Sequence, residues 1–349
     1  MNEIVFLGSF LVLIFICLAL DLGVFNKKSH EVSFKESLLF TLIWVSLTVV
    51  FFIFLRYFGH LLHHIENMDE LIAINLRHKH GLVFNPDADF ISNLQLYRNQ
   101  LSLEFITGYA IEYVLSIDNI FVILMIFISF SVDKKYYHRV LFWGILGAII
   151  MRFIFIFSLS ALIHQFEWVL AIFGIILIIS AIKMFLSRNK EEKISVKDHK
   201  IVKYVSNHFS VTPDYVGQQF FTKINHKRYI TPLFLVLLII EFSDVIFAVD
   251  SVPAIFSITQ DSYIVFFSNI FAIIGLRSLF FLLSSIVKLF RFLKIGISVL
   301  LVFIGVKMLL ETILNISIGT TASLILILST LILCILLSII IPKKANNDR

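Results

Sequence analysis

Long apolar runs separated by polar loops fill the chain from end to end. Nine runs reach the length of about 20 residues that a membrane-spanning helix needs. They lie at about 4–25, 37–57, 103–129, 139–163, 167–187, 231–257, 263–286, 294–314 and 321–341. Two stretches, 58–102 and 188–230, are too polar to span. The pattern predicts an all-α polytopic membrane protein of about nine transmembrane helices, forming one domain over residues 1–349.

Three of these runs repeat later in the chain. The motif EYVLSIDNIF (112–121) is echoed by DVIFAVDSVP (244–253), and each places two acids six residues apart. Downstream, GAIIMRFIFIF (147–157) matches AIIGLRSLFFL (272–282), and SAIKMFL (180–186) matches IGVKMLL (304–310). Spans three to five therefore repeat as spans six to eight.

The repeat predicts how the single domain is organised. We expect two N-terminal spans (1–57), an external loop (58–102), a first three-helix repeat (103–187), a cytoplasmic loop (188–230), a second three-helix repeat (231–314), and a last span with a cytoplasmic tail (315–349). The N-terminal run lacks a basic region and a small-residue cleavage site, which favours a retained helix over a cleaved signal peptide. In the loop 188–230, the stretch SVTPDYVGQQFFTKINHKRY indicates ordered structure with a turn at Pro213-Asp214.

The distribution of basic residues predicts the topology. Of 29 Lys and Arg residues, 21 lie in one set of alternating loops, four in the opposite set, and four inside predicted spans. Cytoplasmic loops carry the excess of Lys and Arg. The N-terminus is therefore expected outside and the C-terminus inside, so that the two repeats run in opposite directions. Inverted repeats of this kind are typical of secondary transporters, which bind substrate at the repeat interface.

Composition supports the membrane assignment. The chain is 59% hydrophobic and 15% charged, against roughly 25% charged residues in soluble domains. The net charge of +5 is spread over short loops, which indicates a lipid bilayer and no nucleic acid as partner. Two cysteines in apolar runs, Cys17 and Cys334, imply no disulfide framework.

Carboxylates inside the repeated spans are the strongest functional signal, because each is costly in a bilayer. On a helix, Glu112, Ser116 and Asn119 share one stripe. The expected metal ligands are Glu112, Asp118, Asn119, Glu241, Asp244, Asp250 and Ser251. The supporting residues are Asp21, Glu104, Arg152 and Arg277. Asp118 and Asp250 point roughly 120° away from their partner acids on a straight helix. Pro253 is expected to kink or open the helix, which could re-aim Asp250.

An oxygen-rich site of this kind suits Mg²⁺, Ca²⁺ or Mn²⁺. Crowded carboxylates in a low dielectric need protons or cations, so exchange between the two would give metal/proton antiport. The alternative is that the acids form structural ion pairs with Arg152, Arg277, Lys183 and Lys307, although Lys183 is expected to extend to the membrane surface. Asp21 also has an alternative interpretation, as a helix-end residue among lipid headgroups.

Histidines cluster in the first polar stretch. His60 and His64 lie one helical turn apart, and HKH ends at His80. They could form a peripheral metal site, but solvated loop histidines are the favoured interpretation. No phosphate-binding loop or Ser/His/Asp order accompanies them, and no prosthetic group or enzyme activity is expected.

Several long motifs resemble one known family. EFITGYAIEYVLSIDNIFVILMIF, HRVLFWGILGAIIMRFIFIF, and the stretch from RYITPLFLVLLIIEFSDVIFAVDSVPAIF through FFSNIFAIIGLRSLFFLL are similar to the TerC family of bacterial inner-membrane proteins, in its longer, Alx-like branch. ALDLGVFNKKSHEVSFKESL near the N-terminus fits as well. The external loop at 58–95 is longer than in compact members.

The resemblance implies a function that the residues alone leave open. It implies a multi-pass inner-membrane protein of manganese export, metal homeostasis or tellurium resistance, with the family's acidic positions at the seven expected ligands. It narrows the transported ion to Mn²⁺ and leaves protons as a possible counter-ion. A non-transporting scaffold or chaperone in metal homeostasis or tellurite resistance is the alternative, and the oligomeric state stays open.

Overall fold

The computed structural model describes residues 3–25, 33–166, 168–187, 200–224, 226–286 and 292–340. The first half contains α1 (Glu3–Phe25), α2 (Phe34–Phe58), the 3₁₀ turn η1 (Gly59–Leu61), α3 (Met68–Arg77), α4 (Phe90–Ser129), α5 (Lys134–Gln165) and α6 (Trp168–Ser187). The second half contains α7 (Lys200–His208), β1 (Phe221–Ile224), β2 (Lys227–Ile230), α8 (Pro232–Phe256), α9 (Ser262–Ile286), α10 (Leu293–Leu314) and α11 (Thr320–Ile340).

Eight of these helices are long and apolar enough to cross a membrane: α2, α4, α5, α6, α8, α9, α10 and α11. The predicted first span forms α1, whose apolar stretch over the described residues is the shorter Val5–Leu18. The chain is thus an all-α polytopic membrane protein, with a small antiparallel β1–β2 hairpin as its exception.

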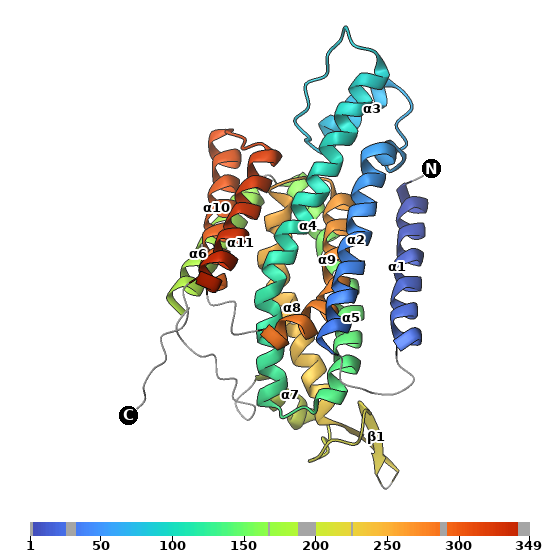
Figure 1. Cartoon of the computed structure of the whole chain (residues 1–349), viewed down its shortest axis with the longest axis vertical. Coiled ribbons are helices and arrows are strands. Elements are labelled where there is room, and N and C mark those ends of the chain that lie inside the picture. Colours follow the sequence, from blue (N-terminus) through green and yellow to red (C-terminus); the bar gives the residue numbers. More distant parts are fainter. Residues whose placement is uncertain are drawn as a thin grey trace.

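The two ends of the helix bundle carry different structures (Figure 1). We call the end with η1, α3 and the α8–α9 loop the histidine end, and the opposite end with α7 and the β1–β2 hairpin the hairpin end. Helices α4, α6, α9 and α11 run from the histidine end to the hairpin end, whereas α5, α8 and α10 run back. At the hairpin end, the Tyr215 hydroxyl donates to the Phe130 carbonyl at 2.7 Å and attaches the hairpin segment to α4.

Helix α4 begins earlier than its hydropathy indicates. The sequence predicts a start at residue 103, but the helix begins at Phe90 and has 40 residues. The Asp89 side chain accepts a hydrogen bond from the Ser92 amide at 3.1 Å, which is a standard N-cap. Leu94, Tyr97 and Leu101 are buried on one face of this extension. Amphipathic packing, rather than a continuous apolar run, therefore continues the helix beyond the predicted span.

Helix α9 forms the centre of the bundle. In its membrane-spanning segment 94% of the residues are buried, against 22% in α2, α6 and α11. Helices α2, α4 and α5 pack around α9, while α6 packs on α10. The exposed aliphatic side chains of the outer helices, such as Val50 on α2 and Ile325 on α11, match a lipid-facing surface.

Pro253 does not open α8 as the sequence indicates. Helix α8 continues through Pro253 to Phe256, and the Ser257 amide donates to the Pro253 carbonyl at 3.1 Å. The proline lies in the last turn, where the helix is about to end, so the missing amide interrupts little helix. The expected break at mid-span is therefore wrong.

Candidate functional site

A buried arginine joins the two repeated segments. Arg152 on α5 is 0% exposed and donates hydrogen bonds to Glu112 on α4 and to Asn269 on α9. It also donates to both carboxylate oxygens of Asp244 on α8, at 3.1 and 3.4 Å, and to the Ser251 hydroxyl at 3.2 Å. Asn269 donates in turn to Glu112 at 3.3 Å. We call these five residues the arginine network.

The network carries an excess of negative charge. One guanidinium faces two carboxylates, Glu112 and Asp244. The Glu112 and Arg152 side chains are both 0% exposed. Isolated charges are very costly to bury, so they occur in pairs or with metals. Counted against the one guanidinium, the two carboxylates leave one negative charge over, and the Asp244 side chain is 18% exposed.

A small cavity adjoins this network. It has a volume of about 30 Å³ and is lined by Asn119, Ser243, Asp244 and apolar side chains of α4, α5, α8 and α9. This space exceeds the roughly 10–15 Å³ that one water needs. The Nδ2 of Asn119 is buried without a hydrogen-bond partner among the described residues. The cavity is therefore mostly apolar, with Asn119, Ser243 and Asp244 as the polar residues on its wall, and it has room for a water.

The remaining predicted ligands lie at other contacts. Asp250 accepts a hydrogen bond from Ser180 on α6 at 3.0 Å. The Glu241 carboxylate packs directly on Gly147 of α5, leaving no space there for a Cβ. Asp118 is half-buried on α4, next to the buried Asn119. The structure thus brings Glu112, Asp244 and Ser251 together and lines the adjoining cavity with Asn119, while Asp250 lies at the α6–α8 contact.

The other supporting residues and the two intramembrane lysines make separate contacts. Arg277 on α9 contacts His138 on α5 at 2.8 Å. Asp21 lies in α1, in a stretch whose side chains are outside those that the structure describes. Glu104 is 1% exposed and lies at the histidine end. Lys183 is exposed, as expected, whereas Lys307 is buried and donates to Ser323 at 3.3 Å.

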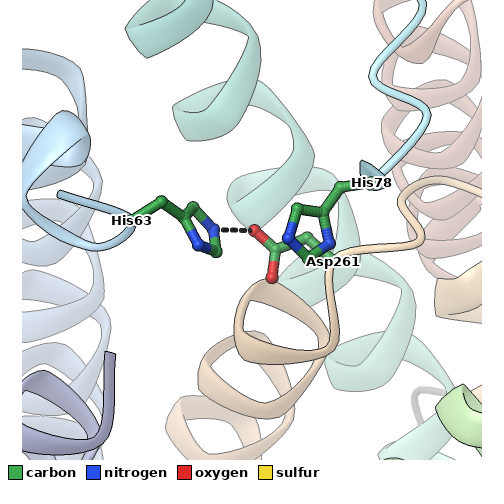
Figure 2. A group of neighbouring side chains, drawn as sticks. All are labelled: His63, His78 and Asp261. Atoms are coloured by element: carbon green, nitrogen blue, oxygen red, sulfur yellow. Dashed lines mark hydrogen bonds and ion pairs between the residues drawn. The ribbon is translucent and has the colours of Figure 1, made fainter. Parts of the chain in front are cut away.

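The histidine end contains a second polar cluster. His63, His78 and Asp261 are buried, and one potential ligand atom from each lies within 4.8 Å of the others. His63 follows η1, His78 caps α3, and Asp261 immediately precedes α9 (Figure 2). His63 Nε2 lies 2.8 Å from Asp261 Oδ2, and its Nδ1 lies 2.9 Å from Glu3 Oε1. This group could hold a metal ion.

Protonation differs between the two histidines. Burial opposes a charge on His63, but attraction and hydrogen bonds to Asp261 and Glu3 outweigh burial and raise the His63 pKa to about 9. Burial lowers the pKa of His78 to about 4. Although burial would raise the pKa of Asp261, the neighbouring histidines hold it well below its usual range. At neutral pH, His63 is thus an imidazolium between two carboxylates, and His78 is neutral.

A further pair borders this cluster. His80 Nδ1 lies 3.0 Å from the Glu104 carboxylate, which also accepts a 2.6 Å hydrogen bond from Thr259. The His78 and His80 ring centres are 5.9 Å apart. The expectation of solvated histidines is therefore wrong for His78 and His80, which are 4% and 7% exposed. It holds for His64, whose side chain is 57% exposed.

The fold and these clusters define a class: a polytopic α-helical membrane protein with ionisable networks buried among its helices. A model of the integral membrane protein TerC family matches residues 97–346. The chain belongs to this family, as the resemblance of its motifs indicates.

Several proteins of similar sequence align with most of the chain. It is 42% identical over 301 residues to "Uncharacterized membrane protein STKORF319" of Myxococcus xanthus, covering 86% of this chain and 82% of that protein. It is 40% identical over 304 residues to "Putative membrane-bound redox modulator Alx" of Escherichia coli K12, covering 87% and 85%. An "Uncharacterized membrane protein" of Rickettsia bellii is 38% identical over 340 residues, covering 97% and 98%. No solved structure matches the chain.

Proposed function

We propose that this protein transports a divalent metal ion across the bacterial inner membrane, with Mn²⁺ as cargo and efflux as the direction. The observation that carries the proposal is the arginine network, which adjoins a small cavity with Asn119, Ser243 and Asp244 on its wall. Intramembrane ionisable residues mark ion pathways by default. The oxygen atoms of Glu112, Asn119, Asp244 and Ser251 match the ligand preference of Mn²⁺.

The helix directions support an inverted repeat of α4–α6 and α8–α10. Figure 1 shows α4, α5 and α6 running down, up and down, and α8, α9 and α10 running up, down and up. Each helix also packs on its counterpart: α4 on α8, α5 on α9, and α6 on α10. In such transporters the ion site lies at the repeat interface near the bilayer midplane. The arginine network draws on both repeats at this interface.

The basic loops support the orientation of the proposed transporter. Among the described residues, α7, the β1–β2 hairpin and the start of α5 carry basic side chains at the hairpin end, such as Lys203, Lys227 and Lys134. The proposed transporter therefore has this end in the cytoplasm and the histidine end outside. With α1 as the ninth span, the N-terminus lies outside and the C-terminus inside.

The residual negative charge suggests how a cation is released. A proton can take the place of the metal in neutralising the extra carboxylate, because both are favoured by crowded carboxylates. The positive charge of Arg152 offsets one of the two carboxylates, which limits the number of further cations that the network can bind. Exchange of one metal ion for protons would then let protons that enter down their gradient drive the export of the metal. Manganese is a redox-active metal, and its export is therefore compatible with the name "Putative membrane-bound redox modulator Alx" of the relatives.

Reconstituted transport tests the proposal. Purified protein is placed in liposomes with a metal-sensitive dye inside, and Mn²⁺ is added outside with and without a pH gradient. We expect uptake by the wild type and loss of uptake in Glu112→Gln and Asp244→Asn, which change the two carboxylates of the arginine network, because a neutral amide cannot balance the cation. Asp69→Asn, at an exposed acid of α3, is the matched control and keeps wild-type uptake. Wild-type uptake in both acid variants, at equal protein content, would refute the assigned pathway.

One observation favours a second candidate, a non-transporting membrane scaffold. Arg152 already binds both Glu112 and Asp244, as purely structural ion pairs would. Absence of Mn²⁺ uptake by folded wild-type protein under every gradient would favour the scaffold.

A further inference from the structure

We propose that His63, His78 and Asp261 form a second metal site at the histidine end, selective for a divalent first-row transition metal of the zinc class. The site is separate from the arginine network and independent of transport. It would fasten the segment 59–89, which we call the cap, to the transmembrane bundle. His63 comes from the loop between η1 and α3, His78 from the C-terminal end of α3, and Asp261 from the residue before α9.

The donor set defines the metal class. Two imidazoles and one carboxylate are a set that binds Zn²⁺ and other first-row divalent ions, often with a further position open to water. Mg²⁺ and Ca²⁺ prefer oxygen ligands alone. The two sites therefore differ in chemistry, because the arginine network offers no imidazole.

The geometry is close to that of a bound ion. Ligand atoms at about 2.1 Å from a tetrahedral metal lie about 3.4 Å from one another. His63 Nε2 and Asp261 Oδ2 are 2.8 Å apart, and the three ligand atoms lie within 4.8 Å of each other. Shifts of about an ångström per side chain suffice to enclose an ion.

His78 is the observation that points to a ligand. Its residue is 4% exposed, and both Nδ1 and Nε2 are buried without a hydrogen-bond partner among the described residues. A buried polar group without a partner is costly, so its position requires an explanation. The ring lies 4.8 Å from His63, centre to centre, and beside Asp261 (Figure 2). A metal bound by one of its nitrogens provides the missing interaction.

The surrounding residues hold the ligands in place. Glu3 lies 2.9 Å from His63 Nδ1, so the Nδ1 proton can stay in the hydrogen bond to Glu3 while the metal displaces the proton from Nε2, as in carboxylate–histidine–metal arrangements. Asp261 Oδ1 accepts from the Tyr263 and Ile264 amides at the start of α9, at 2.9 and 3.4 Å. These two hydrogen bonds occupy Oδ1 and leave Oδ2 directed to the histidines. Glu3, His63 and His78 precede the family-matched segment 97–346, whereas Asp261 lies within it.

Calorimetric titration of the full-length protein in detergent with Zn²⁺ tests the site. The test variant is His78→Phe, which keeps an aromatic ring but removes both nitrogens. Because His78 has no hydrogen bond to lose within the described chain, the fold should survive. We expect at least a 100-fold weaker Zn²⁺ affinity for this variant. His78→Gln is the second test variant, and His64→Phe is the matched control at an exposed histidine.

A second measurement distinguishes binding here from adventitious binding elsewhere. Zn²⁺ should raise the thermal unfolding temperature of the wild type and of His64→Phe, but not of either His78 variant. Glu3→Gln should weaken Zn²⁺ binding by about 10- to 100-fold, as expected for a residue that orients a ligand. Wild-type affinity in both His78 variants, or no Zn²⁺ binding by the wild type, overturns the proposal. Neither result depends on Mn²⁺ transport, so the two proposals can fail separately.

Discussion

Replacing Arg152 with methionine should strongly destabilise the protein. The guanidinium is fully buried and donates to Glu112, Asp244, Ser251 and Asn269. Methionine fills much of the volume but leaves two carboxylates without their cation. Removing one partner of a buried ion pair costs about 3–5 kcal/mol. At 1.4 kcal/mol per factor of ten, this lowers the folded-to-unfolded ratio by roughly two to four powers of ten.

Titration with a denaturing detergent measures this change. Unfolding of purified protein in mixed micelles is followed by the fluorescence of the three tryptophans, and free energies of unfolding are compared. Lys35→Met, which removes an exposed cation at the start of α2, is the control and should change little. The double variant Glu112→Gln/Arg152→Met should be less destabilised than the sum of the single changes, because the two groups are in contact.

Two outcomes would refute this reasoning. A free energy of unfolding for Arg152→Met within about 1 kcal/mol of the wild type would mean that the carboxylates are already neutral or hydrated. Additive effects in the double variant would mean that Glu112 and Arg152 are not coupled in the folded protein.

Two further predictions concern glycines at close helix contacts. Gly147→Ala should displace the Glu241 carboxylate, because a Cβ at this position overlaps it. If Glu241 serves the proposed pathway, this variant takes up less Mn²⁺ into liposomes. Gly8→Ala, at a glycine with open space around it, is the control and should keep wild-type uptake. Gly305→Ala should separate α6 from α10, since its Cβ would lie 2.6 Å from the Gly174 carbonyl oxygen. Overpacking of this kind costs about 1–3 kcal/mol, measurable by the same detergent titration, and an unchanged stability would contradict the close packing.

The sequence predicts the spans and much of the buried polar network for a physical reason. An apolar run long enough to cross a bilayer has few alternatives to a helix, because every backbone group must be hydrogen-bonded internally. A carboxylate within such a run needs a partner inside the protein. The stripe of Glu112 and Asn119 on α4 and the choice of Arg152 as partner follow from helical spacing and charge alone.

The histidine cluster could not be predicted in the same way. His63 and Asp261 are 198 residues apart, and nothing local in either segment indicates their contact. His78 and His80 lie in a polar stretch that resembles a solvated loop. The burial of these side chains depends on how the cap packs against α4 and the α8–α9 loop, which hydropathy does not encode. The one available signal was the density of histidines itself.

Helix α4 joins the two polar clusters mechanically. Its 40 residues extend about 60 Å, twice the roughly 30 Å of the hydrocarbon core. Glu104 contacts the cap through His80, and Glu112 contacts Arg152. The two acids are separated by about 12 Å of unbroken helix. Any axial shift of α4 that loosens Glu112 from Arg152 must also pull Glu104 from His80. Helix α4 therefore links the histidine end to the arginine network.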